Sequence, residues 1–243
     1  MVANVILFDL DGTLLPMDTD SFVKHYLKEL AQKVAPIVDP EQFVKALWAG
    51  TEAMVKSDDP SKTNEAVFEE RFLNLLQLKR EEIWPTLDHF YKEVFPQFSR
   101  LAEPTPLAKE VVNEALNQGY RVAIATNPLF PREAIEHRMT WAGIKDLPFE
   151  VVTVYEESSF TKPHPAYYEE ICNRLDVKPE ECIMVGNDKQ EDMVAGSLGM
   201  KTYLVEGWVI DRGEPSYVID DQGTLNQLLE KLKQKEGTFA RRV

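Results

Sequence analysis

The chain opens with a short apolar run that leads directly into two carboxylates. Val5 to Phe8 have the pattern of a buried strand, and Asp9 and Asp11 follow it one residue apart. Because side chains at positions i and i+2 of an extended chain share a face, both carboxylates point the same way at the carboxyl end of the strand, where open α/β sheets bind ligands. Two like charges so close repel each other unless a cation, a shared proton or solvent relieves them. The pattern therefore predicts either a reactive site or an ordinary exposed Asp-Gly turn.

Further polar residues follow apolar strands or stand before a helix: Thr126, Asn127, Lys162, Asp188 and Asp192. Each has an ordinary structural interpretation. Thr126 could cap a turn before a proline, and Lys162 could be a solvated loop lysine. The two aspartates could be acids in the first turn of a helix, where the helix dipole favours them. Taken one by one, these residues leave the question open.

From residue 104 onward, strand patterns alternate with helical patterns. We expect strands over 120–125, 149–154, 182–185 and 201–205, and helices over 105–118, 131–142, 165–175, 189–198 and 224–235. Such alternation is typical of right-handed β-α-β crossovers, so it predicts an α/β fold with a doubly wound, mainly parallel sheet. The segment 206–220 is less regular, and 237–243 has the composition of a solvated tail.

Residues 17–102 have a helical pattern throughout. Apolar residues recur at helical spacing in four stretches, and a polar, proline-bearing loop over 56–61 separates the second from the third. The fourth stretch is expected to run from Ile83 to Phe95. We therefore predict two domains, a core made of 1–16 and 103–243 and a helical module of 17–102 inserted between the first two strands.

The motifs resemble, in their order and strand contexts, the four signature motifs of the haloacid dehalogenase-like hydrolase superfamily. They are an Asp-x-Asp-Gly-Thr strand end, a strand-end Thr, a Lys-Pro before a helix, and a Gly-Asn-Asp-x-x-x-Asp strand end, and together they span residues 5–205. The resemblance implies a Rossmann-like core whose first strand is central, so that all four motifs meet at one edge. It also identifies 17–102 as a type-one helical cap, which closes over the site and largely chooses the substrate.

The resemblance also implies a role for each residue. Asp9 is the expected nucleophile and forms an aspartyl-phosphate, while Asp11 protonates the leaving oxygen and later activates water. Thr126, Asn127 and Lys162 are expected to bind the substrate phosphate, with the lysine offsetting negative charge on the phosphate and on Asp9.

Magnesium is the expected cofactor, since hard cations prefer carboxylate and carbonyl oxygens. By resemblance its ligands are Asp9, Asp188 and main-chain oxygen near Asp11. Asp192 either supports this metal shell or pairs with Lys162, a duty that Glu191 could share. The four histidines are scattered without ligand spacing, so none is assigned to a metal.

The second aspartate distinguishes branches of the superfamily. Dehalogenases lack it, because they release no alkoxide that needs a proton, so Asp11 favours phosphoryl transfer. We expect a magnesium-dependent phosphatase that acts on a small phosphorylated metabolite. A sugar-phosphate mutase on the same scaffold is one alternative, and a non-catalytic binding or regulatory protein is another. Phosphonatases of this superfamily need a lysine from the cap. The lysines of 17–102 lie on polar helix faces or in loops, so we expect them to be surface residues.

Composition excludes several classes of partner. With 27 Lys and Arg against 41 Asp and Glu the net charge is −14, which disfavours nucleic acid or an anionic membrane surface as partner. No apolar run approaches the roughly 18 residues of a membrane span. Cys172 and Cys182 lack metal-type clustering, and a reducing cytoplasm is the expected location. The sequence leaves the oligomeric state open.

Substrate choice is expected to depend on residues of the cap. Those near its mouth are candidates for contact with the leaving group: Asp18, His25, Tyr26 and Arg71. Tyr26 also lies on an apolar helical stripe, so core packing is its alternative role.

Overall fold

The computed structural model describes residues 3–240 and contains a six-stranded sheet in the order β3-β2-β1-β4-β5-β6. Every neighbouring pair is parallel. The strands are β1 (Val5–Phe8), β2 (Arg121–Ile124), β3 (Val151–Val152), β4 (Cys182–Gly186), β5 (Lys201–Val205) and β6 (Asp221–Gly223). β1 is central, and its last residue, Phe8, is in register with Ile124 of β2 and Val185 of β4. The predicted doubly wound α/β fold is confirmed.

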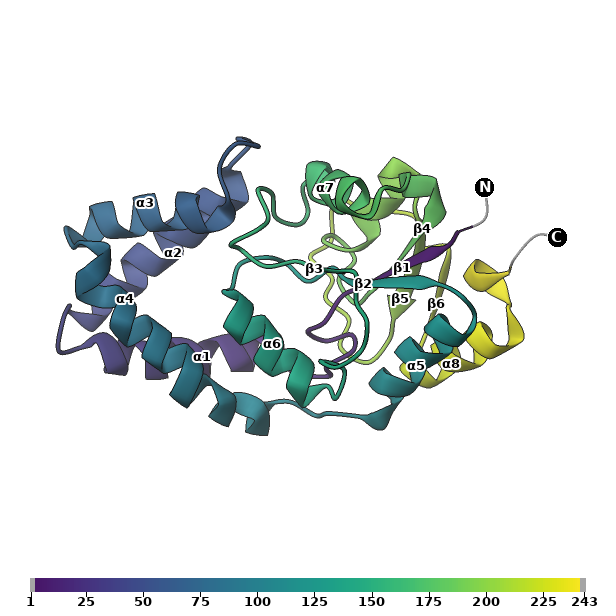
Figure 1. Cartoon of the computed structure of the whole chain (residues 1–243), viewed down its shortest axis with the longest axis horizontal. Coiled ribbons are helices and arrows are strands. Elements are labelled where there is room, and N and C mark those ends of the chain that lie inside the picture. The colour runs from purple at the N-terminus through teal and green to yellow at the C-terminus, as the bar shows by residue number, and fades with distance from the viewer. Residues whose placement is uncertain (1–2, 241–243) are drawn as a thin grey trace.

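Helices cover both faces of this sheet (Figure 1). They are α5 (Pro106–Asn117), α6 (Arg132–Trp141), α7 (Pro165–Leu175), the 3-10 helix η4 (Met193–Leu198) and α8 (Leu225–Gln234), with short 3-10 turns at η3 (Pro179–Glu181) and η5 (Gly237–Phe239). Alternate residues of β1 serve the two faces: Ile6 and Phe8 share a core with α5, α6 and α8, whereas Val5 and Leu7 pack with α7 and η4. The period of two in the strand thus produces a three-layer molecule.

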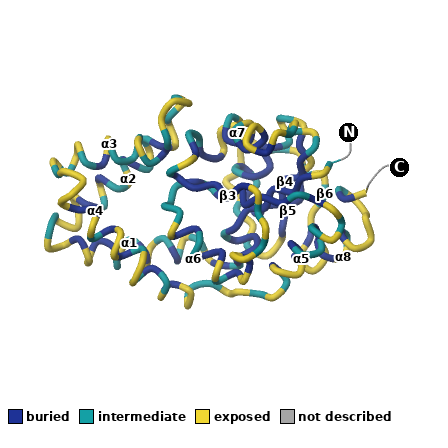
Figure 2. The backbone as a smooth tube through the Cα atoms, in the orientation of Figure 1, coloured by how far each residue is buried: buried dark blue, intermediate teal, exposed yellow. Residues whose placement is uncertain are grey.

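Four α-helices fill the chain between β1 and α5 and lie to one side of the sheet (Figure 1). They are α1 (Thr19–Val34), α2 (Pro40–Lys56), α3 (Asn64–Leu76) and α4 (Arg80–His89), which continues into a π-helical turn, η1 (Phe90–Val94), and a 3-10 helix, η2 (Phe95–Leu101). Carboxylates cap the first two, because Asp18 accepts from the Ser21 N–H and Asp39 accepts from two N–H groups of the first turn. Figure 2 shows the buried strands against helices that alternate buried and exposed positions.

This helical segment leaves the sheet layer and returns to it at one place. Met17 and Ala102 form an isolated antiparallel bridge, and the Glu103 N–H donates to the Pro16 carbonyl at 2.8 Å. Two adjacent crossings therefore join residues 17–102 to the rest of the chain.

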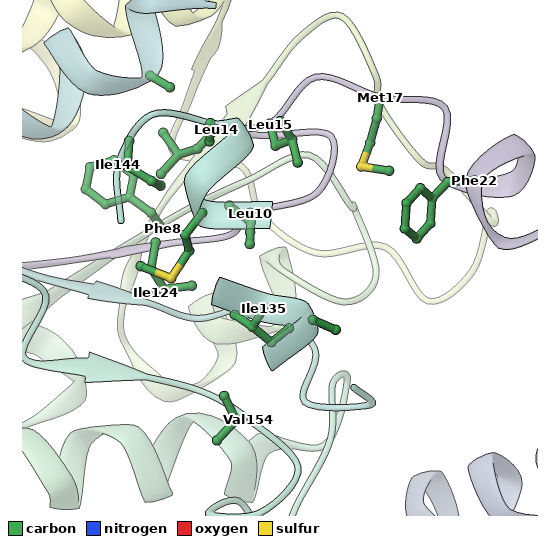
Figure 3. Close-up of a cluster of buried hydrophobic side chains, with 14 of the residues drawn as sticks. Phe8, Leu10, Leu14, Leu15, Met17, Phe22, Ile124, Ile135, Ile144 and Val154 are labelled. Carbon is green, nitrogen blue, oxygen red and sulfur yellow. The ribbon is translucent and has the colours of Figure 1, made fainter. Parts of the chain in front are cut away.

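A continuous apolar core reaches from the sheet into the helical segment. Figure 3 shows buried side chains of β1, of the turn after it and of β2 and α6, extending through Met17 to Phe22 of α1. The Phe22 ring packs edge-on against Phe95 and Phe98 at centroid distances of 5.8 and 6.0 Å. The helical segment is thus packed on the layer that carries the sheet.

The structure corrects four expectations about elements. The helix expected over 189–198 is reduced to the 3-10 helix Met193–Leu198, because the Asp188 carboxylate accepts from the N–H groups of Gln190 and Glu191 and holds a turn there. The fourth helical stretch begins at Arg80, before the expected Ile83. β6 was not predicted, since its three residues are polar or glycine.

The fourth correction concerns the chain end. Phe239 is buried, in contact with the rings of Tyr120 and Tyr203, so the expected solvated tail does not begin at residue 237. Residues 241–243 of that tail lie outside the described part. Among residues 3–240, no helix has the length and hydropathy needed to cross a membrane.

Candidate active site

The ends of the central strands carry the first two carboxylates. Asp9 directly follows β1, and its N–H donates to the Val185 carbonyl of β4 at 2.9 Å. Asp188 stands two residues beyond β4. Both aspartates are buried, at 7% and 5% exposure. Because parallel strands end at the same edge, the topology brings together carboxylates that lie 179 positions apart in the sequence.

Lys162 lies between two of these acids. Its Nζ is 3.0 Å from Asp9 Oδ1 and 2.6 Å from Asp192 Oδ1, and its side chain is buried. Burial alone would lower the pKa of this lysine, but the carboxylates of Asp192 and Asp9 outweigh it, and the pKa is raised well above its usual value. Lys162 is therefore held as a buried ammonium ion.

Asp192 approaches Lys162 because a glycine leaves room for it. Its Oδ2 accepts from the Asp188 N–H at 2.9 Å. A Cβ on Gly186 would lie only 2.1 Å from that same oxygen. Gly186 is thus required by the close approach of a carboxylate to the end of β4.

Thr126 and Asn127 form the turn after β2. The Thr126 carbonyl accepts from Thr153 Oγ1 at 2.6 Å and from the Tyr167 hydroxyl at 2.8 Å. The Asn127 side chain accepts from the Lys162 N–H at 3.2 Å and donates to Glu191 Oε2 at 3.0 Å. The Asn127 amide therefore connects the segment that carries Lys162 with the turn that carries Glu191.

Asp11 has a partner that sequence reasoning missed. Its Oδ2 forms an ion pair with Nη1 of Arg138 from α6, which is 2% exposed. Burial raises the pKa of Asp11; Arg138 opposes this shift, and Asp9 adds to it. Asp11 Oδ1 and Arg138 Nη2 are both buried and have no hydrogen-bond partner within the described chain. The one sequence signal was an arginine on the buried face of a helix, between Ile135 and Met139.

A second missed arginine comes from the irregular segment 206–220. Arg212 Nη1 lies 2.5 Å from Asp188 Oδ2, and Nη2 lies 3.4 Å from Glu191 Oε1. Its side chain is half exposed. No pattern around Arg212 points to this contact, because a loop without periodicity does not indicate which way its side chains face.

The charges of the site fit a divalent cation. Five carboxylates gather here: Asp9, Asp11, Asp188, Glu191 and Asp192. They face three cationic side chains: Arg138, Lys162 and Arg212. The carboxylates outnumber the cationic side chains, and a bound cation would offset this excess of negative charge. Within residues 3–240, no three His, Cys, Asp or Glu side chains are arranged to hold a metal by themselves. Mg²⁺ keeps several waters, so two carboxylates and main-chain oxygen suit it.

Of the described residues expected to contact the leaving group, only one lies at a cavity of the helical segment. Tyr26 is buried, and its hydroxyl lies 2.7 Å from that of Tyr91 at an apolar cavity. Asp18 caps α1, and His25 Nδ1 bonds to the Ser21 carbonyl of its own helix. Neither of these two, nor Arg71, is among the described residues that line the cavity.

Known proteins resemble this chain over most of its length. A model of the family described as haloacid dehalogenase-like hydrolase matches residues 6–205. The chain belongs to this family. The four ordered motifs predicted this family correctly. The prediction that the protein is a hydrolase is also confirmed.

Its relatives include pyrophosphatases. Pyrophosphatase PpaX of Bacillus mycoides (strain KBAB4) is 27% identical over 238 residues, covering 96% of this chain and 99% of that protein. PpaX of Bacillus cereus (strain ATCC 10987 / NRS 248) is 27% identical over 247 residues with the same coverage.

Solved structures share the fold over nearly the whole chain. The crystal structure of a phosphatase of this family from Thermococcus onnurineus matches with a TM-score of 0.58 at 22% identity, covering 96% of this chain and 98% of that one. L-2-haloacid dehalogenase from Xanthobacter autotrophicus matches with a TM-score of 0.59 at 16% identity, covering 97% and 100%. One architecture therefore accommodates both a phosphatase and a dehalogenase, so the chemistry must be argued from the site.

Proposed function

We propose that the chain is a magnesium-dependent phosphatase that hydrolyses a small phosphorylated metabolite through an aspartyl-phosphate on Asp9. The observation that carries this proposal is the pairing of Asp9 with a buried lysine, beside the partly buried carboxylate of Asp11, whose buried Oδ1 is unpartnered within residues 3–240. A phosphate ester needs both a nucleophile and a proton for its leaving oxygen. The relatives named pyrophosphatase act on a phosphoanhydride, whose hydrolysis, like that of a phosphate ester, breaks a P–O bond.

The chemistry divides between the two aspartates. Asp9 attacks phosphorus and the ester oxygen leaves, so the phosphoryl group moves to the Asp9 carboxylate. Because Arg138 occupies Asp11 Oδ2, the proton for the leaving oxygen is carried on Oδ1, and the raised pKa of Asp11 favours that protonated form. The same Oδ1 then takes a proton from the water that attacks phosphorus and releases phosphate. Lys162, together with Thr126 and the Asn127 amide, holds the phosphoryl oxygens.

Magnesium would be held by Asp9, Asp188 and main-chain oxygen at Asp11. When bound, it offsets negative charge on the phosphate and on the carboxylates around it. Asp192 acts on this centre through Lys162, whose ammonium it holds at 2.6 Å. Arg212 would then lose its contact with Asp188 and keep the one with Glu191.

Residues 17–102 act as a cap over this site, and 1–16 with 103–243 form the core. Support comes from the paired crossings at Met17 and Ala102, which give the segment a narrow connection to the sheet layer. We also propose that the enzyme works in the cytoplasm, in keeping with its small phosphorylated substrate.

Phosphate release from a broad panel of phosphate esters tests this function, with magnesium or EDTA and with Asp9→Asn as control. Metal-dependent release that vanishes in the control is expected. Isomerised sugar phosphate without free phosphate would instead identify a mutase, and no turnover by folded protein with any ester would favour a binding role.

A further inference from the structure

An apolar cavity of about 150 Å³ that the chemistry above does not use lies between the helical segment and the loops at 129–131 and 155. Its walls come from α1 to α4, from Leu129–Pro131 and from Tyr155, and most of the lining side chains are aliphatic or aromatic. A largely apolar cavity of roughly this size stays dry and accepts a benzene-sized molecule. The cavity therefore has room for an apolar group of about six carbons.

This cavity adjoins the candidate active site through one side chain. Phe130 lines it, and the Phe130 ring also lies 4.4 Å from the guanidinium carbon of Arg138, the residue that pairs with Asp11. Leu129–Pro131 also follow the Thr126–Asn127 turn closely in the chain. The cavity thus lies one side chain away from the Asp11–Arg138 pair and is lined by residues that closely follow the proposed phosphate-binding turn.

The helical segment is fastened over this junction by Asn64, the first residue of α3. Its Nδ2 donates to the carbonyls of Pro128 and Phe160 at 3.3 and 3.2 Å, and its N–H donates to the Ser158 carbonyl at 2.8 Å. Asn64 is fully buried. The cavity and the phosphate-binding turn are thus held in a fixed relation.

Charge at the cavity opposes a second anionic group. Asp88 is its one carboxylate, and none of the described lining residues is lysine or arginine. The chain as a whole carries a net charge of −14. The remote phosphate of pyrophosphate or the carboxylate of phosphoglycolate would meet a negative charge and largely apolar walls here, with no cationic side chain in the described lining to offset the loss of its hydration.

We propose that the substrate is a phosphate monoester whose leaving group ends in an apolar part of about six carbons, seated in this cavity. The inference rests on the proposed phosphatase function and specifies its substrate class. It distinguishes this chain from its pyrophosphatase relatives, whose named substrate has no apolar part.

The test measures kcat/KM, with magnesium, for methyl, butyl and hexyl phosphate, whose leaving alcohols have similar acidity, and for pyrophosphate and phosphoglycolate. A buried methylene contributes about fourfold, so kcat/KM should rise steeply along the alkyl series, and hexyl phosphate should exceed both substrates that carry a second anionic group. A flat series, or pyrophosphate or phosphoglycolate as the better substrate, overturns the inference while leaving a phosphatase.

Two matched variants locate the effect. Leu47→Arg places a cation in the cavity lining and should flatten the alkyl series, whereas Leu75→Arg, at an exposed position of α3, should leave it unchanged. Equal behaviour of the two variants contradicts the inference.

If no ester is hydrolysed, the phosphatase proposal fails. The cavity is then tested by whether it binds a small apolar molecule. Benzyl alcohol should raise the melting temperature of the wild-type and Leu75→Arg proteins and not that of Leu47→Arg. If the three proteins show no such difference in melting temperature, the inference is overturned.

Discussion

At the scale of single residues, the site depends on buried charges that hold one another. Replacing Lys162 with Ala removes a buried ammonium from between Asp9 and Asp192 and leaves both carboxylates without their cation. Breaking a buried pair in this way costs about 3–5 kcal/mol. We predict a loss of that size in the free energy of unfolding measured with urea, together with loss of activity.

Lys189→Ala is the matched control for this loss, because the Lys189–Asp211 pair is about one-third to one-half exposed. Exposed pairs contribute at most about 1 kcal/mol. Partial recovery of stability in the double variant Lys162→Ala, Asp192→Asn is also expected. Equal costs for the two lysines would show that the Lys162 cluster does not stabilise the fold.

In the proposed mechanism Arg138 acts through Asp11, whose carboxylate it holds in an ion pair. Arg138→Ala should lower kcat on the order of a hundredfold for an alkyl phosphate, whose leaving oxygen needs a proton, and much less for p-nitrophenyl phosphate, whose leaving group needs none. Arg138→Lys should recover part of the loss. Arg174→Ala, on the partly exposed face of α7, serves as control. An equal loss with both substrates would contradict a role through the acid.

These residues also show what the sequence could predict. Asp9, Lys162 and Asp188 lie at strand ends or before a helix, so an ordered set of motifs was sufficient to bring them together. Arg138 and Arg212 could not be found in this way. One is an arginine on a buried helix face, and the other lies in an aperiodic loop, and only the tertiary packing shows which carboxylate each contacts.

At the scale of elements, α3 ties the helical segment to the loops around the site. Asn64→Ala removes two side-chain hydrogen bonds to the carbonyls of Pro128 and Phe160 and leaves those groups without these donors. We predict faster backbone hydrogen exchange at the start of α3 and in 128–131, and a lower kcat/KM for the best ester. Asn74→Ala, at an exposed position of the same helix, should change neither. Unchanged hydrogen exchange in Asn64→Ala would show that the Asn64 side chain does not hold α3 against these loops.

The elements that the sequence predicted correctly are those with strong periodicity, such as α1, with a buried stripe from Phe22 to Val34, and α8. The errors fall where side chains override local pattern. Asp188 turns residues 188–191 out of a helix, and Tyr120 and Tyr203 bury Phe239 in a stretch that reads as polar.

At the scale of the whole molecule, the proposed magnesium site at the surplus of carboxylates should link metal binding to stability. Ligand binding to the native state stabilises it by about 2.7 kcal/mol at a hundred times Kd. For a chain of this size, each kcal/mol raises the melting temperature by roughly 2–4 °C. Magnesium at saturating concentration should therefore raise Tm by several degrees, and Asp188→Asn should reduce the rise. An equal rise in both proteins would place the ion elsewhere.

The proposed mechanism requires Asp9 to carry the phosphoryl group during the reaction. The most direct measurement incubates the Asp11→Asn variant with magnesium and p-nitrophenyl phosphate labelled with ³²P, and then quenches in acid. This substrate needs no proton to leave, but an amide in place of the Asp11 carboxylate cannot activate water. We therefore expect label on the peptide that contains Asp9, and none when Asp9→Asn is added. Release of labelled phosphate without labelled protein, or label on another peptide, would contradict it.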